Sequence, residues 1–147
     1  MDAVLHAHSG LRYVVLALLL VAILIGLKGW LGNNNFTGFH KKINLFTLIS
    51  IHIQLLLGII LYFTSSMVQF NEFTMKTEAI RFFTVEHSAG MILAVILATI
   101  GKKKVDSANV PRTKFKRMFI FYLITLIIIF VSIPWPFLKP ELFRGWF

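Results

Sequence analysis

Four long apolar runs, separated by short polar connections, constrain most strongly what this sequence can fold into. They cover about residues 9–31, 43–66, 82–101 and 117–136. A helix needs about 20 apolar residues to cross the hydrocarbon core of a bilayer, and each run meets that need. Because lipid forces every backbone polar group to be paired within the protein, the runs predict four transmembrane helices.

The order of these runs predicts an all-α integral membrane protein, a four-transmembrane-helix bundle of up-down-up-down order. Of the 147 residues, 57% are apolar, which is too many for a soluble domain of this size. No stretch is left over for a second domain, so we expect residues 1–147 to form a single membrane domain. Residues 137–147 follow the IPWP motif at 133–136 and include Trp146, and we expect them to form an interfacial tail at the outer surface.

Positive charge is concentrated in two of the three connections. The connection between the second and third runs carries only Lys76 and Arg81, offset by Glu72 and Glu78, whereas the other two are basic. The positive-inside rule therefore predicts that both termini lie outside and that the two basic loops lie in the cytoplasm. The basic loops are expected to lie against anionic lipid headgroups. This arrangement accounts for most of the formal net charge of +9, so nucleic acid is not an expected partner.

The absence of cysteine limits the chemistry that the chain can carry. It excludes thiolate metal sites, iron–sulfur clusters and covalent attachment of haem. Any bound metal must be held by His, Met or carboxylate side chains. Ionisable residues within a membrane span are costly, so each one is a candidate functional residue.

Two of the apolar runs open alike, with HSGLRY at 8–13 and EHSAGM at 86–91. Both runs are expected to cross from outside to inside, which puts His8 and His87 near the outer ends of diagonal helices, where they can face each other. Two neutral imidazoles from facing helices are typical ligands of a b-type haem. We therefore predict haem b with His8 and His87 as axial iron ligands. Counting from the lysines at the inner ends gives a depth difference of about 7 Å, part of which helix tilt absorbs.

Two neighbouring residues fit this prediction, and each also has a plainer interpretation. Arg12 lies one helical turn after His8, where its guanidinium can pair with a haem propionate or, with His8, reach to lipid headgroups. Gly90 begins a stripe of small residues with Ala94 and Ala98. Such a stripe lets a flat ring lie against the backbone, or lets two helices pack closely.

His52 lies near the middle of the second run, too deep to reach the interface. It is separated by about 160° around the helix from Gln54, at 100° per residue, so the two cannot face the same point. Gln54 belongs instead to a stripe of polar and small residues that includes Thr47, Ser50, Gly58 and Ser65. His52 is an alternative iron ligand, although pairing with His87 implies a depth difference of about 10 Å. Otherwise it forms a hydrogen bond between helices.

Three further residues have weaker assignments. Glu86 is either a proton carrier for a quinol or a first-turn carboxylate that suits a helix N-terminus. His6 and His8 form an HxH pair that, with His87 and Glu86, can bind copper or zinc only if the pair is extended. His40 is expected on the cytoplasmic surface.

Four motifs resemble those of small four-span bacterial membrane proteins described as cytochrome b-like. They are HSGLRY, HIQLLLGIILYF at 52–63, VEHSAGM at 85–91 and IPWP at 133–136. The resemblance covers nearly the whole chain, and it implies a haem b in the bundle and a role in membrane electron transfer. The positions that match its histidine-bearing motifs are His8, His52 and His87.

These observations favour an electron carrier or complex subunit over a stand-alone enzyme. The first hypothesis is a b-type haem-binding electron-transfer protein, with the haem in the outer half of the bundle, exchanging electrons with quinol or a respiratory complex. The alternative is a non-catalytic accessory or assembly subunit of a larger membrane complex, whose histidines are structural. A metal transporter that uses the HxH pair is a third hypothesis, disfavoured because no span carries a cluster of carboxylates or Met.

Overall fold

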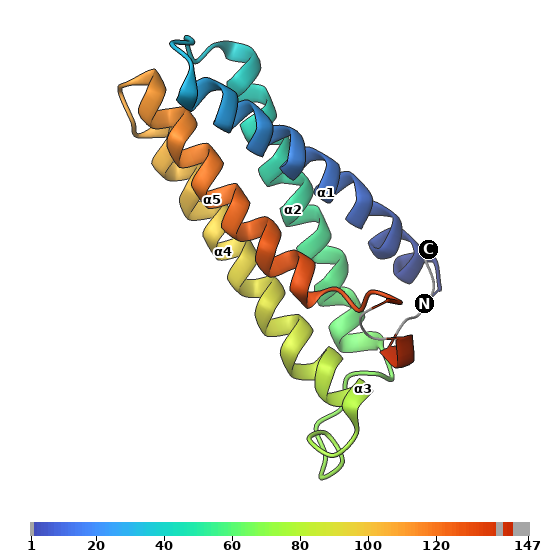
Figure 1. Ribbon diagram of the computed structural model, residues 1–147. Coiled ribbons are helices and arrows are strands. Elements are labelled where there is room, and N and C mark those ends of the chain that lie inside the picture. Colours follow the sequence, from blue (N-terminus) through green and yellow to red (C-terminus); the bar gives the residue numbers. More distant parts are fainter. Residues whose placement is uncertain (1, 138–139, 143–147) are drawn as a thin grey trace.

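The computed structural model describes residues 2–137 and 140–142, and within them four long helices form an antiparallel bundle with no strand. Helix α1 pairs with α2, α2 with α4, α4 with α5, and α5 with α1, so α1 and α4 lie diagonally. Figure 1 shows the start of α1 and the end of α5 at one end of the bundle, opposite the α1–α2 and α4–α5 connections. The predicted up-down-up-down bundle is therefore confirmed. The long helices are α1 (Asp2–Leu31), α2 (Gly38–Thr64), α4 (His87–Asp106) and α5 (Pro111–Ser132).

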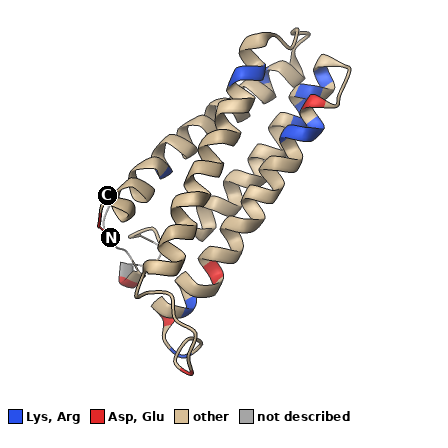
Figure 2. Ribbon diagram, turned by 180° about the vertical axis from the view of Figure 1, so that it is seen from behind, with Lys and Arg blue, Asp and Glu red and all other residues tan. Residues whose placement is uncertain are grey.

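The bundle has the dimensions and surface of a multi-pass membrane protein. Four helical segments of the described chain are long and apolar enough to cross a membrane. Their outer faces carry large apolar side chains, among them Leu24, Phe46, Ile96 and Ile127, each at least half exposed. An apolar surface of this extent is expected to contact lipid or another protein. Figure 2 shows Lys and Arg gathered around the end that carries the α1–α2 and α4–α5 connections.

The helix ends depend on local chemistry rather than on where the apolar runs stop. Helix α1 begins at Asp2, well before the apolar run, and α5 begins with Pro111, whose missing N–H costs nothing in the first turn of a helix. Helix α5 ends at Ser132, short of the predicted residue 136. The reason is that a residue before proline disfavours the helical conformation, and Ile133 is extended (φ −88°, ψ 134°) before Pro134.

The third membrane segment is not a uniform α-helix. It begins as α3 (Glu78–Arg81), continues through a single π-helical stretch, η1 (Phe82–Glu86), and becomes α4 at His87. A π-helical turn widens the helix and changes the direction in which the following side chains point. His87 is the first residue after this change.

Helix α5 is the central packing partner, because both α1 and α4 contact it closely through glycines. A Cβ on Gly26 of α1 would come within 2.8 Å of the backbone nitrogen of Phe119, and one on Gly101 of α4 would meet the ring of Phe121. Small residues at helix interfaces allow this approach of backbones. The bundle is therefore tightly closed towards the basic end.

The segment after α5 folds back onto the bundle. Trp135 is buried, and its ring lies 5.0 Å from that of Phe130 and 5.7 Å from that of Phe137. Leu142, in a short 3-10 helix (Pro140–Leu142), is buried as well. Of the predicted interfacial tail 137–147, residues 138–139 and 143–147, with Trp146, lie outside the described residues.

Candidate functional site

A cavity of about 750 Å³ lies inside the bundle towards the end where α1 begins. Its walls are mostly apolar, and its size is within the range of about 300–1,000 Å³ typical of ligand pockets. A few polar side chains from three helices converge on it. Among them are His8, Ser9 and Arg12 of α1, Gln54 of α2, and His87 and Ser88 of α4.

The structure brings His8 and His87 together at this cavity. Their ring centroids lie 6.4 Å apart, and the ring planes are inclined by 70°. A bond from a metal ion to an imidazole nitrogen is about 2.0–2.1 Å long, so two imidazoles on opposite sides of one metal ion have centroids about 6 Å apart. The centroid separation of the pair is therefore close to the value that two imidazoles bound to one metal ion would have.

These two imidazoles are not part of a larger protein-only metal centre. No group of three or more His, Cys, Asp or Glu side chains suited to a metal ion occurs among residues 2–137 and 140–142. A metal held by His8 and His87 would thus need its remaining ligands from other kinds of side chain or from a bound group. A porphyrin supplies four such ligands to haem iron and leaves the two axial positions to the protein.

The ring of His87 is held in one orientation by α5. Its Nδ1 lies 2.8 Å from the carbonyl oxygen of Ser132. Because a carbonyl oxygen only accepts hydrogen bonds, Nδ1 carries the proton and Nε2 has the lone pair, as in histidines that ligate metals. The rings of Phe82 and Phe83 lie 5.9 and 6.1 Å from that of His87 and enclose it.

The π-helical stretch that precedes His87 is held by hydrogen bonds from neighbouring side chains. Ser88 Oγ donates to the carbonyl of Phe83 over 2.7 Å, and the Tyr62 hydroxyl donates to the carbonyl of Thr84 over 3.1 Å. Widened turns of this kind are common at functional sites. No signal in the sequence marks this turn, because the residues FFTVE are equally compatible with an ordinary α-helix.

His8 stands against helix α2. Gln54 Nε2 donates to the His8 carbonyl over 2.8 Å, and Gly58, one turn later, leaves room for the imidazole. His8 Nδ1 and Gln54 Oε1 are buried and have no hydrogen-bond partner among the described residues. A buried polar atom without a partner costs about 1–3 kcal/mol, so this corner of the bundle fits a site that a bound group completes.

Arg12 supplies a positive charge at the same cavity, one turn along α1 from His8. Its Nη2 donates to the Tyr13 hydroxyl over 3.2 Å, and the guanidinium carbon lies 4.9 Å from the Tyr13 ring centroid. The guanidinium is thus kept within the bundle, where a carboxylate of a bound ligand can pair with it.

His52 lies apart from this group. Its Nδ1 is 2.9 Å from the carbonyl of Leu48, and its Nε2 is 3.4 Å from Thr99 Oγ1 of α4. His52 is thus held by its own helix and lies within hydrogen-bonding distance of α4. The polar stripe on the other side of α2 faces α1, where Thr47 Oγ1 donates to the carbonyl of Leu18 over 3.4 Å.

Gly90 does not line the cavity. A Cβ at this position would collide with the hydroxyl of Ser132, so the glycine allows α4 to approach α5 beside His87. Glu86 is exposed and accepts a hydrogen bond of 2.8 Å from Arg81 Nε. Both residues therefore flank the site without facing the space between the two imidazoles.

The HxH pair does not have the conformation that joint metal binding requires. His6 and His8 both lie within α1, which is helical from Asp2 onwards, so their side chains point in different directions. His6 is exposed, whereas His8 is half-buried at the cavity. An HxH metal site is thus not formed.

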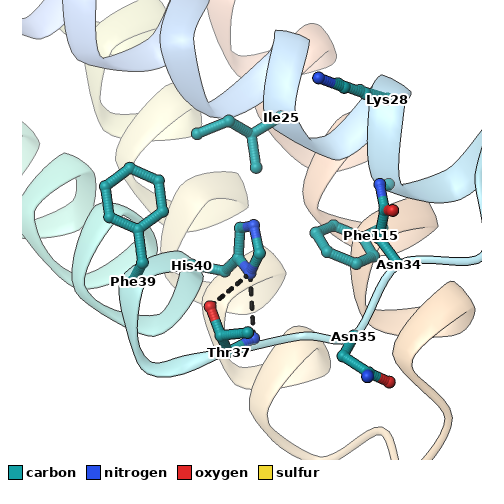
Figure 3. Close-up of a pocket in the computed structure, with 9 residues that line it drawn as sticks. Ile25, Lys28, Asn34, Asn35, Thr37, Phe39, His40 and Phe115 are labelled. Carbon is teal, nitrogen blue, oxygen red and sulfur yellow. Dashed lines mark hydrogen bonds between the residues drawn. The ribbon is translucent and has the colours of Figure 1, made fainter.

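A second, smaller cavity of about 430 Å³ lies at the basic end, where α1 leads into α2. Figure 3 shows His40 at its centre, with Nδ1 close to Thr37. The Thr37 backbone N–H donates to His40 Nδ1 over 3.0 Å, which caps the first turn of α2. The ring of His40 also lies 5.0 Å from that of Phe115. Lys28 and Asn34 line the same cavity.

Comparison of the chain with protein-family models, with curated proteins and with solved structures found no match. The class of the protein therefore follows from its own architecture. It is an all-α four-helix bundle, with helices of membrane-spanning length, in which two histidines from diagonal helices face one cavity.

Proposed function

We propose that the protein is a b-type haem-binding membrane protein that transfers electrons, with His8 and His87 as the axial iron ligands. The observation that carries this proposal is the 6.4 Å separation of the two imidazoles at a cavity of about 750 Å³. Bound haem b supplies reversible one-electron chemistry at its iron. The residues that would hold it all come from the chain itself.

Each residue at the cavity has a distinct task in this proposal. His87 presents Nε2, because Ser132 binds its other nitrogen. His8 presents its ring from α1 while Gln54 and Gly58 of α2 fix its position. Arg12 would pair with a propionate of the bound haem. The mostly apolar walls favour a hydrophobic macrocycle.

Optical spectroscopy tests the proposal directly. The protein expressed with a supply of haem and purified in detergent is expected to show a Soret band and a reduced α band. His8→Ala and His87→Ala should each abolish these bands. His52→Ala is the matched control, because His52 is also a half-buried membrane histidine but hydrogen-bonds to Leu48 and Thr99 away from the cavity. Absence of bands in the wild-type protein would favour the accessory-subunit alternative.

We also propose that both termini lie outside the cytoplasm, because of the basic charge at the opposite end of the bundle. The resemblance to small four-span bacterial proteins supports a bacterial inner membrane as the location. The chain has no native cysteine, so single cysteines report topology without background. Asn33→Cys, in the α1–α2 connection, should be protected from a membrane-impermeant maleimide in intact cells. Glu72→Cys, in the connection after α2, should react. The reverse pattern would overturn the orientation.

Anionic lipid headgroups are the proposed partners of the basic end. Lys114 and Lys116 lie over the rings of Phe36 and Trp30, at 5.6 and 5.5 Å from the ring centroids. Lys114 Nζ also donates to the carbonyls of Val105 and Asp106. A lysine anchored on an aromatic ring at the end of a bundle, as Lys116 is, presents its charge at headgroup level. A higher unfolding midpoint in anionic than in zwitterionic vesicles, reduced in Lys114→Gln/Lys116→Gln, would support this partner.

Quinol is the proposed electron donor, because the cavity reaches the lipid-facing surface between α2 and α4. Among its lining residues, Ile59, Phe63 and Ile92 are 44%, 82% and 54% exposed. A lipid-soluble molecule can reach this rim without leaving the bilayer. Ile92→Trp should slow reduction of the haem protein by a quinol in vesicles. Ile96→Trp, also exposed on α4 but not at the rim, should leave the rate unchanged.

A further inference from the structure

The last turn of α5 contains two carbonyl groups that cannot accept the usual α-helical hydrogen bond. In an α-helix a carbonyl accepts from the N–H four residues further along the chain. For Phe130 and Ser132 those positions are occupied by Pro134 and Pro136, and proline has no N–H. Both carbonyls are therefore available to other donors.

Two side chains supply the missing donors. Trp135 Nε1 donates to the carbonyl of Phe130 over 2.8 Å, and His87 Nδ1 lies 2.8 Å from the carbonyl of Ser132. One donor comes from the segment after α5, and the other comes from α4, 45 residues earlier in the chain. The end of α5 is thus closed by side chains in place of backbone N–H groups.

The prolines also set the path of the chain beyond Ser132. Ile133 is extended because it precedes a proline, and the backbone N–H of Trp135 donates to the Ile133 carbonyl over 3.0 Å. The chain therefore leaves the helix axis directly after Ser132, and no following turn covers its carbonyl. Gly90 of α4, which has no Cβ to strike Ser132, allows the two helices to meet there.

We propose that Pro134 and Pro136 are positioning residues that fix the tautomer of His87. A neutral imidazole carries one proton. By keeping the Ser132 carbonyl free of a helical donor, the prolines hold that proton on Nδ1 and leave Nε2 with its lone pair towards the cavity. The importance of this tautomer for function rests on the proposed role of His87 as an iron ligand. The tautomer itself is a property of the protein without haem.

Nitrogen-15 NMR of the full chain labelled at histidine and prepared without haem tests this inference, because imidazole nitrogen shifts distinguish the two tautomers. The His87 signals are assigned by their loss in His87→Ala. In the wild-type protein His87 should be mainly Nδ1-protonated. In Pro134→Ala/Pro136→Ala the helix can continue and the N–H of residue 136 can bind the Ser132 carbonyl, so His87 should become mainly Nε2-protonated.

Pro111→Ala is the matched control, because it makes the same change at the first turn of α5, and it should leave the tautomer unchanged. An Nε2-protonated His87 in the wild-type protein would overturn the inference, even if the double variant fails to fold. So would an unchanged Nδ1-protonated ring in a folded double variant. The NMR samples contain no haem. Either of these two NMR results can therefore be distinguished from a failure of the protein to bind haem in the optical test.

Discussion

Gly58 of α2 lies directly against the imidazole ring of His8 of α1. A Cβ at position 58 would come within 3.3 Å of His8 Cε1 and 3.8 Å of His8 Nδ1. The space beside this glycine is therefore filled by the imidazole ring. Gln54, one turn earlier on α2, binds the backbone carbonyl of the same histidine. One face of α2 therefore fixes both the backbone and the ring of His8.

Gly58→Ala should weaken haem binding by displacing the ring of His8. A contact of 3.3 Å requires the ring to move by a few tenths of an ångström, and overpacking of this kind costs about 1–3 kcal/mol. Haem titration monitored at the Soret band measures the effect. Gly10→Ala is the control, because a Cβ there meets nothing within 4 Å. Equal affinity in the two variants would show that the position of His8 does not depend on Gly58.

Tyr122→Phe should destabilise the bundle without affecting the haem site. The Tyr122 hydroxyl lies 2.5 Å from Asn44 Oδ1 and 3.1 Å from the Asn44 carbonyl, and it joins the diagonal helices α5 and α2. Removing it leaves a buried acceptor unsatisfied, at a cost of about 1–3 kcal/mol in the free energy of unfolding. Unfolding in mixed detergent measures this. Tyr122→Phe/Asn44→Leu should cost less than the single change, and a larger cost would contradict the polar-contact explanation.

The sequence was sufficient to predict the fold but not the ends of its elements. Four apolar runs with short connections leave few arrangements other than an up-down-up-down bundle, so the diagonal placement of α1 and α4 followed. Hydropathy continues through residue 136, yet α5 ends at Ser132 because of the prolines beyond it. Helix ends depend on such local backbone chemistry, and the mean hydropathy of a segment does not detect it.

The candidate site was predictable where it depends on topology and unpredictable where it depends on distant contacts. The order of the helices was sufficient to predict that His8 and His87 face each other. The depth difference of about 7 Å, counted at 1.5 Å per residue, assumed that Lys28 and Lys102 mark one level. Helix α4 instead continues to Asp106, which pairs with Lys102. The parts played by Gly58 and Ser132 had no local signal, because both act on histidines elsewhere in the chain.

Glu86→Gln should leave both stability and electron transfer unchanged. The carboxylate pairs with Arg81 at an exposed position, with side chains 41% and 36% accessible, and exposed ion pairs contribute little. It also lies outside the cavity lining. The checks are the unfolding midpoint and the rate of reduction by quinol in vesicles. A rate reduced more than about tenfold, at an unchanged midpoint, would instead establish Glu86 as a proton carrier.

Gly90→Ala should disturb the haem site indirectly, through Ser132. The added Cβ would strike the Ser132 hydroxyl and force α4 and α5 apart where the Ser132 carbonyl binds His87. We expect a cost of about 1–3 kcal/mol in stability together with weaker haem binding. Ser132→Ala alone should be mild, since it keeps the carbonyl, and combined with Gly90→Ala it should restore part of both losses. A double-mutant cycle on unfolding and haem affinity measures this coupling. Strict additivity of the two changes would mean that Gly90 and Ser132 do not act on His87 together.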